Sequence, residues 1–377
     1  MAIWFETALT PDGWRDGVRV IVEQGRIARV EPGDPRPEDE RHRIGIPGLP
    51  NLHSHGFQRG MAGLTGERKG EENFWSWREV MYRFVDRLDP EDIAAITAQA
   101  YAEMLESGFT HVAEFHYLHN DRNGARYADP AQTGGSIAAA AEASGIGLTL
   151  LPVFYAHGDF GGAEPGEGQK RFISDLDGYA ELHEASRGKL REGDRLGVAA
   201  HSLRAVTPEQ LEAIIELGDG PIHIHIAEQT REIEACLAWS GQRPVKWLLD
   251  HADVDARWCC IHATHMTDAE TEALARSGAV AGLCPITEAD LGDGLFPARH
   301  FLEAGGTFGV GSDSNVLIDA AGELRLLEYG QRLRDRGHLP HDVAHFVNRL
   351  VFCMFAEDVD LLPDHMFTKM LEASGSH

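Results

Sequence analysis

The sequence predicts an α/β protein in which a (β/α)8 TIM-like barrel follows a small β domain. From about residue 46 onward, short apolar segments alternate with polar loops and amphipathic helical segments. Near-continuous apolar strands are typical of a parallel sheet covered by helices, and eight such strands close a barrel. A doubly wound open sheet is the alternative topology. The candidate strands are residues 46–52, 109–115, 146–154, 196–201, 221–226, 258–262, 279–284 and 307–311.

Several helices between these strands have recognisable first and last residues. Asp89-Pro90-Glu91 is expected to open a helix that ends at Ser107-Gly108. Asp is a good helix cap, Pro fits the first turn, and Gly commonly follows the last turn. Capping boxes at residues 207–210 and 267–270 predict two more helix starts.

The chain before the barrel has a different pattern. Residues 1–45 contain short strands with tight connections, including a turn at Gln24-Gly25, and are expected to form a small β domain. Residues 46–337 are expected to form the barrel. Two segments are predicted to be long loops over its catalytic end: residues 63–73 and 158–168.

Composition limits the class of protein. A chain of 377 residues with 43% apolar residues can form a soluble globular protein with a substantial core. Its net charge of -26 argues against nucleic acid or an anionic membrane as a partner, yet a small anionic substrate can still be held by local arginines. We recognise no membrane-spanning segment and no signal peptide, so a cytoplasmic location is expected. The five cysteines lack zinc-ribbon spacing and are expected to be reduced.

Histidines and one aspartate recur where the predicted strands end. His53 and His55 end the first strand, His225 the fifth and His262 the sixth, while Asp313 follows the eighth. Barrel enzymes place their chemistry at the C-terminal ends of the strands. Imidazole nitrogen and carboxylate oxygen are zinc ligands, and a catalytic zinc leaves one position open for a water that it activates. The sequence therefore predicts a catalytic zinc site at this end.

Some of these residues have alternative roles. His223 and His225 lie on one strand, and we expect only one of them to be a ligand. We favour His225, because the carboxylate of Glu228 follows it in the loop and could transfer protons. Asp313 could instead cap the next helix, although three histidines at matching places favour a ligand. Ordinary hydrogen-bonded roles are expected for His119, His157 and His251.

These motifs resemble those of the amidohydrolase superfamily, and most closely its formimidoylglutamate deiminases. Mononuclear deaminases of the superfamily have His-x-His after the first strand, His-x-x-Glu after the fifth, His after the sixth and Ser-Asp after the eighth. The Trp-Arg and His-Ser-Leu-Arg motifs are more specific to the formimidoylglutamate deiminases. The matching segments are residues 50–59, 74–79, 113–117, 201–208, 223–229, 261–265 and 291–294.

The resemblance implies a role for each matching residue. Zinc, or another divalent metal such as iron, is implied to bind His53, His55, His225 and Asp313. The implied catalytic residues are Glu228 as the proton shuttle, His262 as the group that polarises the attacked carbon's substituent, and Asp313.

The resemblance also implies where the glutamyl part of a substrate would bind. The implied contacts are Gln58, Arg78, Tyr117, His201 and Arg204. Arginine binds carboxylate through two parallel hydrogen bonds, which suits a dicarboxylate. Ordinary surface ion pairs are the alternative role for both arginines.

The implied reaction is the hydrolysis of N-formimino-L-glutamate to N-formyl-L-glutamate and ammonia, a step of histidine degradation. A related deaminase acting on a ring or guanidino substrate is one alternative, and an inactive metal-binding remnant is another. The resemblance ends near Arg336, so residues 338–377 form a divergent tail and the small β domain is expected to be an incomplete β-sandwich. Only the family suggests a homodimer.

Overall fold

The computed structural model describes residues 1–64, 74–337 and 369. The chain divides into two compact units, Met1–Leu49 and Pro50–His377. The predicted tail, apart from Lys369, lies outside the described residues, and so does most of the predicted loop at residues 63–73.

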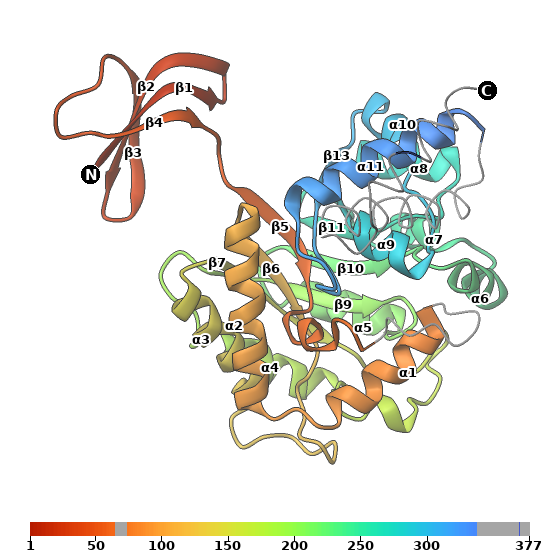
Figure 1. The fold of residues 1–377 in the computed structure, drawn as a ribbon. Coiled ribbons are helices and arrows are strands. Elements are labelled where there is room, and N and C mark those ends of the chain that lie inside the picture. Colours follow the sequence, from red (N-terminus) through yellow and green to blue (C-terminus); the bar gives the residue numbers. More distant parts are fainter. Residues whose placement is uncertain (65–73, 338–368, 370–377) are drawn as a thin grey trace. The chain divides into compact units, whose positions relative to one another are not determined.

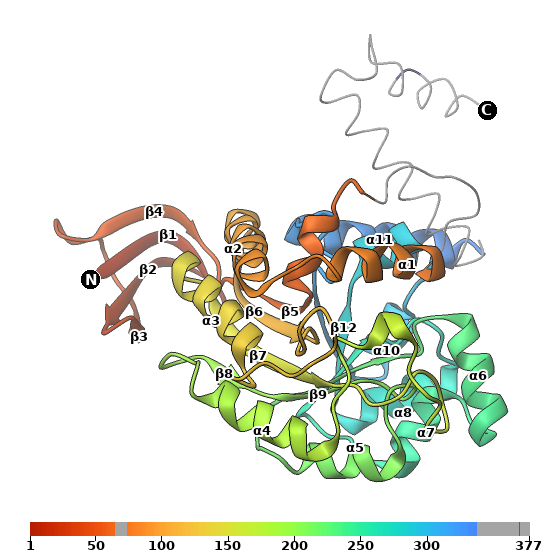
Figure 2. The same ribbon diagram turned by 90° about the horizontal axis from the view of Figure 1, so that it is seen from below.

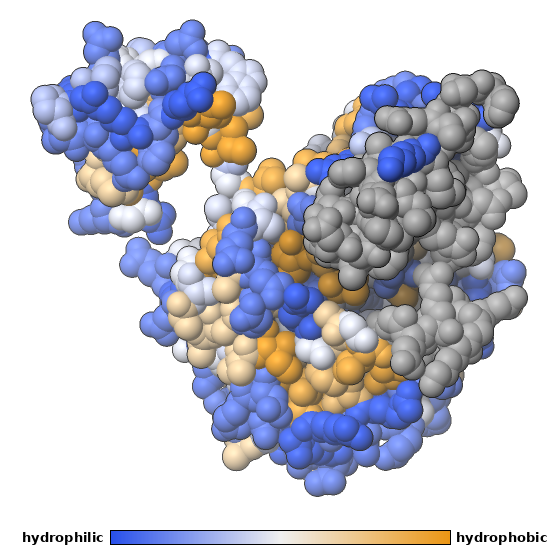
Figure 3. Space-filling view, viewed as in Figure 1, coloured by the Kyte–Doolittle hydropathy of each residue, from blue (hydrophilic) through white to orange (hydrophobic). Residues whose placement is uncertain are grey.

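The first unit is a four-stranded sheet in the order β3-β2-β1-β4. The three N-terminal strands are antiparallel to one another in turn, and the fourth pairs in parallel with β1. Gln24 and Gly25 both have positive φ, as a tight turn between twisted strands requires. Apolar side chains such as Trp14, Ile27 and Ile44 are exposed on this unit, among the hydrophilic ones in Figure 3. The strands are β1 (Ala2–Thr10), β2 (Gly13–Glu23), β3 (Arg26–Pro32) and β4 (Glu40–Gly45).

The second unit is the predicted (β/α)8 barrel, which is confirmed (Figure 1). Its parallel strands follow one another in the order β13-β12-β11-β10-β9-β7-β6-β5, with the short β8 beside β7. A parallel bridge between Ser54 and Asp313 joins the two ends of this sheet. The strands are β5 (Leu49–Ser54), β6 (Phe109–His116), β7 (Gly147–Phe154), β8 (Arg195–Leu196), β9 (Val198–Ser202), β10 (Ile222–Ile226), β11 (Trp258–His262), β12 (Val280–Leu283) and β13 (Thr307–Val310).

The first barrel strand begins later than predicted. We expected residue 46 to belong to it, but β5 starts at Leu49. Pro47 has no N–H to donate to a neighbouring strand, and the side chain of Ile46 is 66% exposed. An apolar residue followed by proline therefore does not join the sheet here.

Helices cover the outside of the sheet, as Figure 2 shows. The predicted start signals are present: Asp89, Thr207 and Thr267 each form a capping box. Gly108, in the left-handed conformation, follows the helix that Asp89 opens. The helices are α1 (Phe74–Val85), α2 (Pro90–Ser107), α3 (Gln132–Ser144), α4 (Leu176–Arg187), α5 (Pro208–Ile215), α6 (Thr230–Ser240), α7 (Pro244–His251), α8 (Asp268–Ser277), α9 (Pro285–Leu291), α10 (Ala298–Glu303) and α11 (Ala320–Asp335), with 3-10 turns η1 (Gly56–Met61) and η2 (Glu167–Gln169).

The barrel strands are buried on both faces, which explains their continuous apolar sequence. Every residue of β10 and of β11 is buried. Aromatic and aliphatic side chains of the surrounding helices pack against them, including Tyr179, Trp247 and Leu274. Burying a polar side chain in such strands costs free energy, and the site histidines lie at or just beyond the C-terminal ends of their strands. Among the described residues, no helix is both long and apolar enough to cross a bilayer.

Candidate active site

Four predicted ligands converge at the C-terminal end of the barrel. The Nε2 atom of His53 lies 3.2 Å from Nε2 of His55 and 2.9 Å from Nε2 of His225. An oxygen of Asp313 lies 3.4 Å from the same nitrogen of His53 and 3.3 Å from that of His55. All four side chains are buried. The structure thus brings together three nitrogens and one oxygen around a common point.

The hydrogen bonds of His55 and His225 indicate which of their nitrogens can bind a cation. His55 and His225 donate from Nδ1 to the backbone carbonyls of Phe115 and His201, at 2.8 and 2.9 Å. A neutral imidazole that donates from Nδ1 carries a lone pair on Nε2. Burial favours the neutral form: it lowers the pKa of His53 to about 3 and that of His225 well below its usual value.

Nε2 of His55 and Nε2 of His225 lie 3.2 and 2.9 Å from Nε2 of His53, whose Nδ1 has no hydrogen-bond partner. When His53 carries its proton on Nδ1, all three Nε2 atoms offer a lone pair that a divalent cation can accept. The donor set of three imidazoles and one carboxylate suits zinc, with room for a further ligand. The residues present therefore fit the metal that the sequence predicts.

The backbone explains how these side chains meet. His53 lies on β5 and His55 directly follows the last residue of that strand, so the two-residue spacing turns both side chains to the same side. Asp313 follows β13, and its N–H and C=O bond to the backbone of His53 and His55 at 2.9 Å each. Asp313 and His262 have φ angles of 46° and 67°. Such left-handed backbone costs non-glycine residues about 1–3 kcal/mol, and it is found most often at functional sites.

Two further predicted residues lie beside the four ligands. An oxygen of Glu228 lies 3.8 Å from Nε2 of His262, and Asp313 approaches the same nitrogen at 3.9 Å. Burial raises the pKa of Glu228 to about 6. Burial disfavours a charged His262, yet the carboxylates of Glu228 and Glu288 outweigh it and raise the pKa of His262 to about 10. Near neutral pH, Glu228 is therefore ionised and able to accept a proton, while His262 is protonated and able to donate a hydrogen bond.

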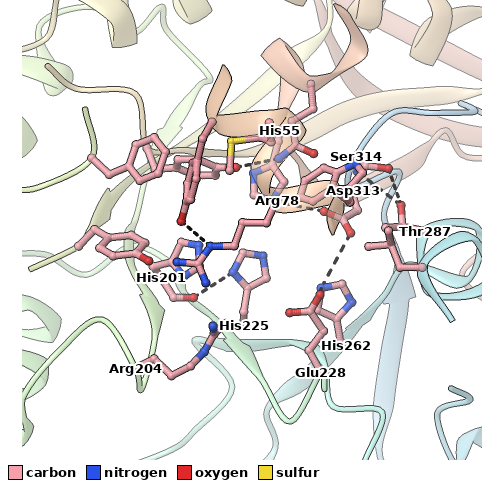
Figure 4. A pocket seen from close by; sticks show the side chains of 18 residues that line it. His55, Arg78, His201, Arg204, His225, Glu228, His262, Thr287, Asp313 and Ser314 are labelled. Atoms are coloured by element: carbon pink, nitrogen blue, oxygen red, sulfur yellow. Dashed lines mark hydrogen bonds and ion pairs between the residues drawn. The ribbon is translucent and has the colours of Figure 1, made fainter. Parts of the chain in front are cut away.

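A cleft opens beside this cluster, and its space is about 590 Å³ when the adjoining open solvent is included. The five residues predicted to bind substrate all line it: Gln58, Arg78, Tyr117, His201 and Arg204. Gln58 donates a hydrogen bond to the hydroxyl of Tyr117 at 2.7 Å. Figure 4 places Arg78, His201 and Arg204 on one side of the cleft, and Glu228, His262 and Asp313 on the other.

Arg204 gives the cleft a buried positive charge. Its side chain is only 8% exposed, and its Nε has no hydrogen-bond partner. Within the described residues, no carboxylate lies at salt-bridge distance from its guanidinium. A buried charge without a partner is costly, so an anion that enters the cleft would be bound strongly. The predicted alternative of a surface ion pair does not apply to this arginine.

Several residues that line the cleft were not predicted from the sequence. Tyr155 directly follows β7, so the rule that sites form at strand ends could have identified it. Phe172 lies in the long connection between β7 and α4, and no sequence signal marks it. The other unpredicted lining residues are Trp77, Met81, Tyr82, Thr287, Leu291 and Ser314.

His223, His119 and His251 do not belong to the four-ligand group. His223 is buried, and its Nδ1 has no hydrogen-bond partner, but only His225 of β10 contributes to the four-ligand group. His119 and His251 bond to the backbone carbonyls of Val153 and Trp247, at 3.0 and 2.7 Å.

Comparison with family models covers most of the chain. The model described as "Amidohydrolase family" matches residues 44–348. The model described as "Formimidoylglutamate deiminase HutF, N-terminal domain" matches residues 1–43. A third model, "MmeI, helicase spacer domain", matches residues 341–377, which apart from Lys369 lie outside the described residues.

Individual relatives are also similar in sequence to this chain. The formimidoylglutamate deiminase of Pseudomonas aeruginosa is 54% identical over 344 residues, which cover 89% of this chain and 75% of that protein. The 8-oxoguanine deaminase of the same organism is 28% identical over 333 residues, covering 84% and 72%.

Solved structures agree in fold. The crystal structure of an amidohydrolase from Brucella melitensis is 55% identical with a TM-score of 0.87, and covers 89% of this chain and 76% of that one. An adenosine deaminase from Xanthomonas campestris, solved with bound zinc, has 23% identity and a TM-score of 0.68, covering 86% and 72%, and shows the fold alone. From the first of these structures, the family models and the Pseudomonas relative, we conclude that this chain belongs to the amidohydrolase family, among the formimidoylglutamate deiminases.

Proposed function

We propose that this protein is a zinc-dependent deiminase that hydrolyses N-formimino-L-glutamate. Water adds to the formimino carbon, the bond from that carbon to its terminal nitrogen breaks, and the products are N-formyl-L-glutamate and ammonia. A metal-dependent hydrolase of C–N bonds is what the family implies, and the Pseudomonas deiminase is the relative that supports this substrate.

The observation that carries the proposal is that one cleft has a four-ligand cluster on one side and two cationic side chains, the half-buried Arg78 and the buried Arg204, on the other. Glu228 and His262 adjoin the ligands, whereas Arg78 and Arg204 line the same cleft beyond His201 (Figure 4). N-formimino-L-glutamate has the matching distribution of groups, with an amidine at one end and two carboxylates at the other. This match supports both the substrate and its orientation.

Each residue then has a chemical task. Zinc, when bound, would lower the pKa of a water molecule and so supply a nucleophile at neutral pH. Glu228 accepts the proton of the attacking water and returns it to the departing nitrogen. His262 donates a hydrogen bond to the polar groups of the attacked carbon. Arg78 and Arg204 hold the carboxylates, which orients the formimino carbon toward Glu228.

A ring or guanidino substrate is less well supported. The 8-oxoguanine deaminase is 28% identical, compared with 54% for the formimidoylglutamate deiminase. A neutral ring would also leave the charge of Arg204 buried without a partner, which costs binding energy.

The proposal extends to the partners and location of the protein. A small dicarboxylate is the proposed partner, and the net charge of -26 makes nucleic acid an unsuitable one. We propose a cytoplasmic location from the sequence, and a homodimer from the family alone.

Ammonia release from N-formimino-L-glutamate tests the function. We expect release by the zinc-loaded protein, none after chelation, and recovery when zinc is returned. Asp313→Ala should bind less zinc and release no ammonia. Ring and guanidino substrates, assayed in parallel, should give little product. A folded wild-type protein that contains one zinc per chain and releases no ammonia would contradict the proposal and favour the inactive-remnant alternative.

A further inference from the structure

We propose that Arg171 is a positioning residue for substrate binding, because it holds the C-terminal end of α1 and thereby the side chain of Arg78 in the cleft. The inference rests on the proposed function, in which Arg78 binds a substrate carboxylate. Arg171 itself does not line the cleft.

Arg171 is a fully buried arginine whose partners are backbone carbonyls. Its side chain is 0% exposed. Its Nη1 donates to the carbonyl oxygens of Val85 and Leu88, the latter at 3.0 Å, and its Nε donates to that of Asn120 at 3.1 Å. No carboxylate of the described residues lies within salt-bridge distance of it. The hydrogen bonds of Nη1 and Nε therefore go to peptide carbonyls, whereas Nη2 has no hydrogen-bond partner.

Two of these carbonyls lie at and just after the C-terminal end of α1, where that of Val85 also accepts from the N–H of Leu88 and that of Leu88 also accepts from Nε of Arg122, at 3.2 Å each. Val85 is the last residue of α1, and Leu88 lies in the turn that follows. The last carbonyls of a helix have no intrahelical donor and carry partial negative charge, so a cation there stabilises the helix end. The rigid fork of arginine can reach carbonyls in several directions at once, which a lysine ammonium cannot do as well.

The same residue joins α1 to the two loops that complete the cleft. The carbonyl oxygen of Arg171 accepts hydrogen bonds from the N–H groups of His119 and Asn120, at 3.0 and 2.9 Å. That loop follows Tyr117, which lines the cleft, and the residue after Arg171 is Phe172, which also lines it. Arg171 thus links three segments that each supply part of the substrate pocket.

Side-chain packing limits how far α1 can shift. Tyr82 of α1 lies so close to η2 that a Cβ on Gly168 would come within 2.5 Å of its ring. The rings of Tyr82 and Phe172 are 6.0 Å apart, and Arg78 donates a hydrogen bond to the hydroxyl of Tyr82. A shift of the helix end would therefore move Tyr82 and Arg78 together.

Arg191 provides a matched control. It also donates to the carbonyls around a helix end, those of Ala141 in α3 and of Ile146, at 2.9 and 2.7 Å. Ile146 immediately precedes β7, so this arginine lies at the N-terminal end of the barrel strands, opposite the cleft. Arg191→Met removes a comparable helix-end contact, together with the ion pair between Arg191 and Asp194 at 2.8 Å, without touching a segment of the pocket.

Steady-state kinetics test the proposal. We expect Arg171→Met to raise KM for N-formimino-L-glutamate about tenfold while kcat stays within about threefold of wild type, the pattern for a loss of ground-state and transition-state binding alike. Arg171→Lys keeps the charge and most of the side-chain stem, so its KM should lie between those of wild type and Arg171→Met. It also provides a test if Arg171→Met does not fold. Arg191→Met should leave KM and kcat unchanged. An equal rise in KM for Arg191→Met would overturn the proposal.

A double-mutant cycle and hydrogen exchange separate positioning from general destabilisation. If Arg171 acts through Arg78, then Arg78→Met/Arg171→Met should bind substrate no worse than Arg78→Met alone. Amide exchange should become faster in residues 77–88 of Arg171→Met, and in residues 132–146 of Arg191→Met. Additive effects on KM, or unchanged exchange in residues 77–88, would overturn the proposal. A wild-type protein without activity would refute the proposed function. Amide exchange in residues 77–88 would then be the measurement that tests the role of Arg171.

Discussion

Oε1 of Glu288 lies 3.2 Å from Nδ1 of His262 and also accepts a hydrogen bond from the backbone N–H of Cys284 at 2.9 Å. Because Nδ1 is engaged by this carboxylate, Nε2 is the nitrogen of His262 that faces Glu228 and Asp313. A carboxylate behind an imidazole determines both its tautomer and its orientation. Glu288 therefore sets the direction from which His262 can contact a substrate.

Replacing Glu288 tests this relationship. We expect Glu288→Leu to lower kcat about 10–100-fold, the usual cost of losing a group that orients an active-site imidazole. Glu288→Gln should lose less, because its amide oxygen can still accept from Nδ1. Steady-state kinetics with zinc content per chain measure both effects. Glu323→Gln is the control, since Glu323 is also buried and accepts from a backbone N–H, that of Ile286, outside the cleft. A kcat of Glu288→Leu within about twofold of wild type would exclude an orienting role.

Replacing Glu228 tests the proton transfer. Glutamine keeps the size of the side chain but cannot accept a proton, so Glu228→Gln should lower kcat about 10²–10⁴-fold. Glu228 is not one of the four clustered ligands, so zinc content should stay at the wild-type level. Rapid-quench measurement of ammonia, together with metal analysis, checks both statements. Near-normal turnover by a zinc-containing variant would remove Glu228 from the mechanism.

The sequence predicted the barrel and the cluster well because both depend on simple periodicities. Strands buried on two faces need continuous apolar residues, and this property identified all eight barrel strands. His53 and His55 follow from the two-residue period of a strand, whereas His225 was preferred to His223 because Glu228 follows it in the loop. Residues at strand ends meet at one end of a barrel, whatever their separation in sequence.

Residues that act from loops and helices could not be predicted in this way. Glu288 lies in the first turn of α9, where an acidic residue usually needs no explanation beyond the helix dipole. Arg171 follows Lys170 in a polar connection and reads as a surface residue, yet it is fully buried. Only the packing of distant segments makes either residue distinctive, and local sequence carries no record of that packing.

The pH dependence follows from the buried state of Glu228. Burial raises its pKa from the usual value of 4.5 to about 6, so the carboxyl stays protonated at pH values where a free glutamate is ionised. A base must be ionised to accept a proton. We therefore expect kcat/KM to rise with pH up to about 6 and to level off above it. The pH profiles of kcat/KM for wild type and Glu228→Gln should differ below about pH 6. A wild-type kcat/KM that instead rises around pH 4.5 would contradict the assignment of Glu228 as the base.

Arg204 should determine which carboxylate pattern the enzyme accepts. Its buried guanidinium has no carboxylate partner among the described residues, so a substrate carboxylate would form charge-assisted hydrogen bonds there. Such bonds contribute about 1.5–3 kcal/mol, so Arg204→Met should lower kcat/KM for N-formimino-L-glutamate about 10–100-fold. Two analogues sharpen the test, one without the α-carboxylate and one with the side-chain carboxylate replaced by an amide. The wild-type enzyme should discriminate against both, whereas Arg204→Met should lose discrimination against one of them. If the variant lost the same factor with all three compounds, Arg204 would not contact a carboxylate of the substrate.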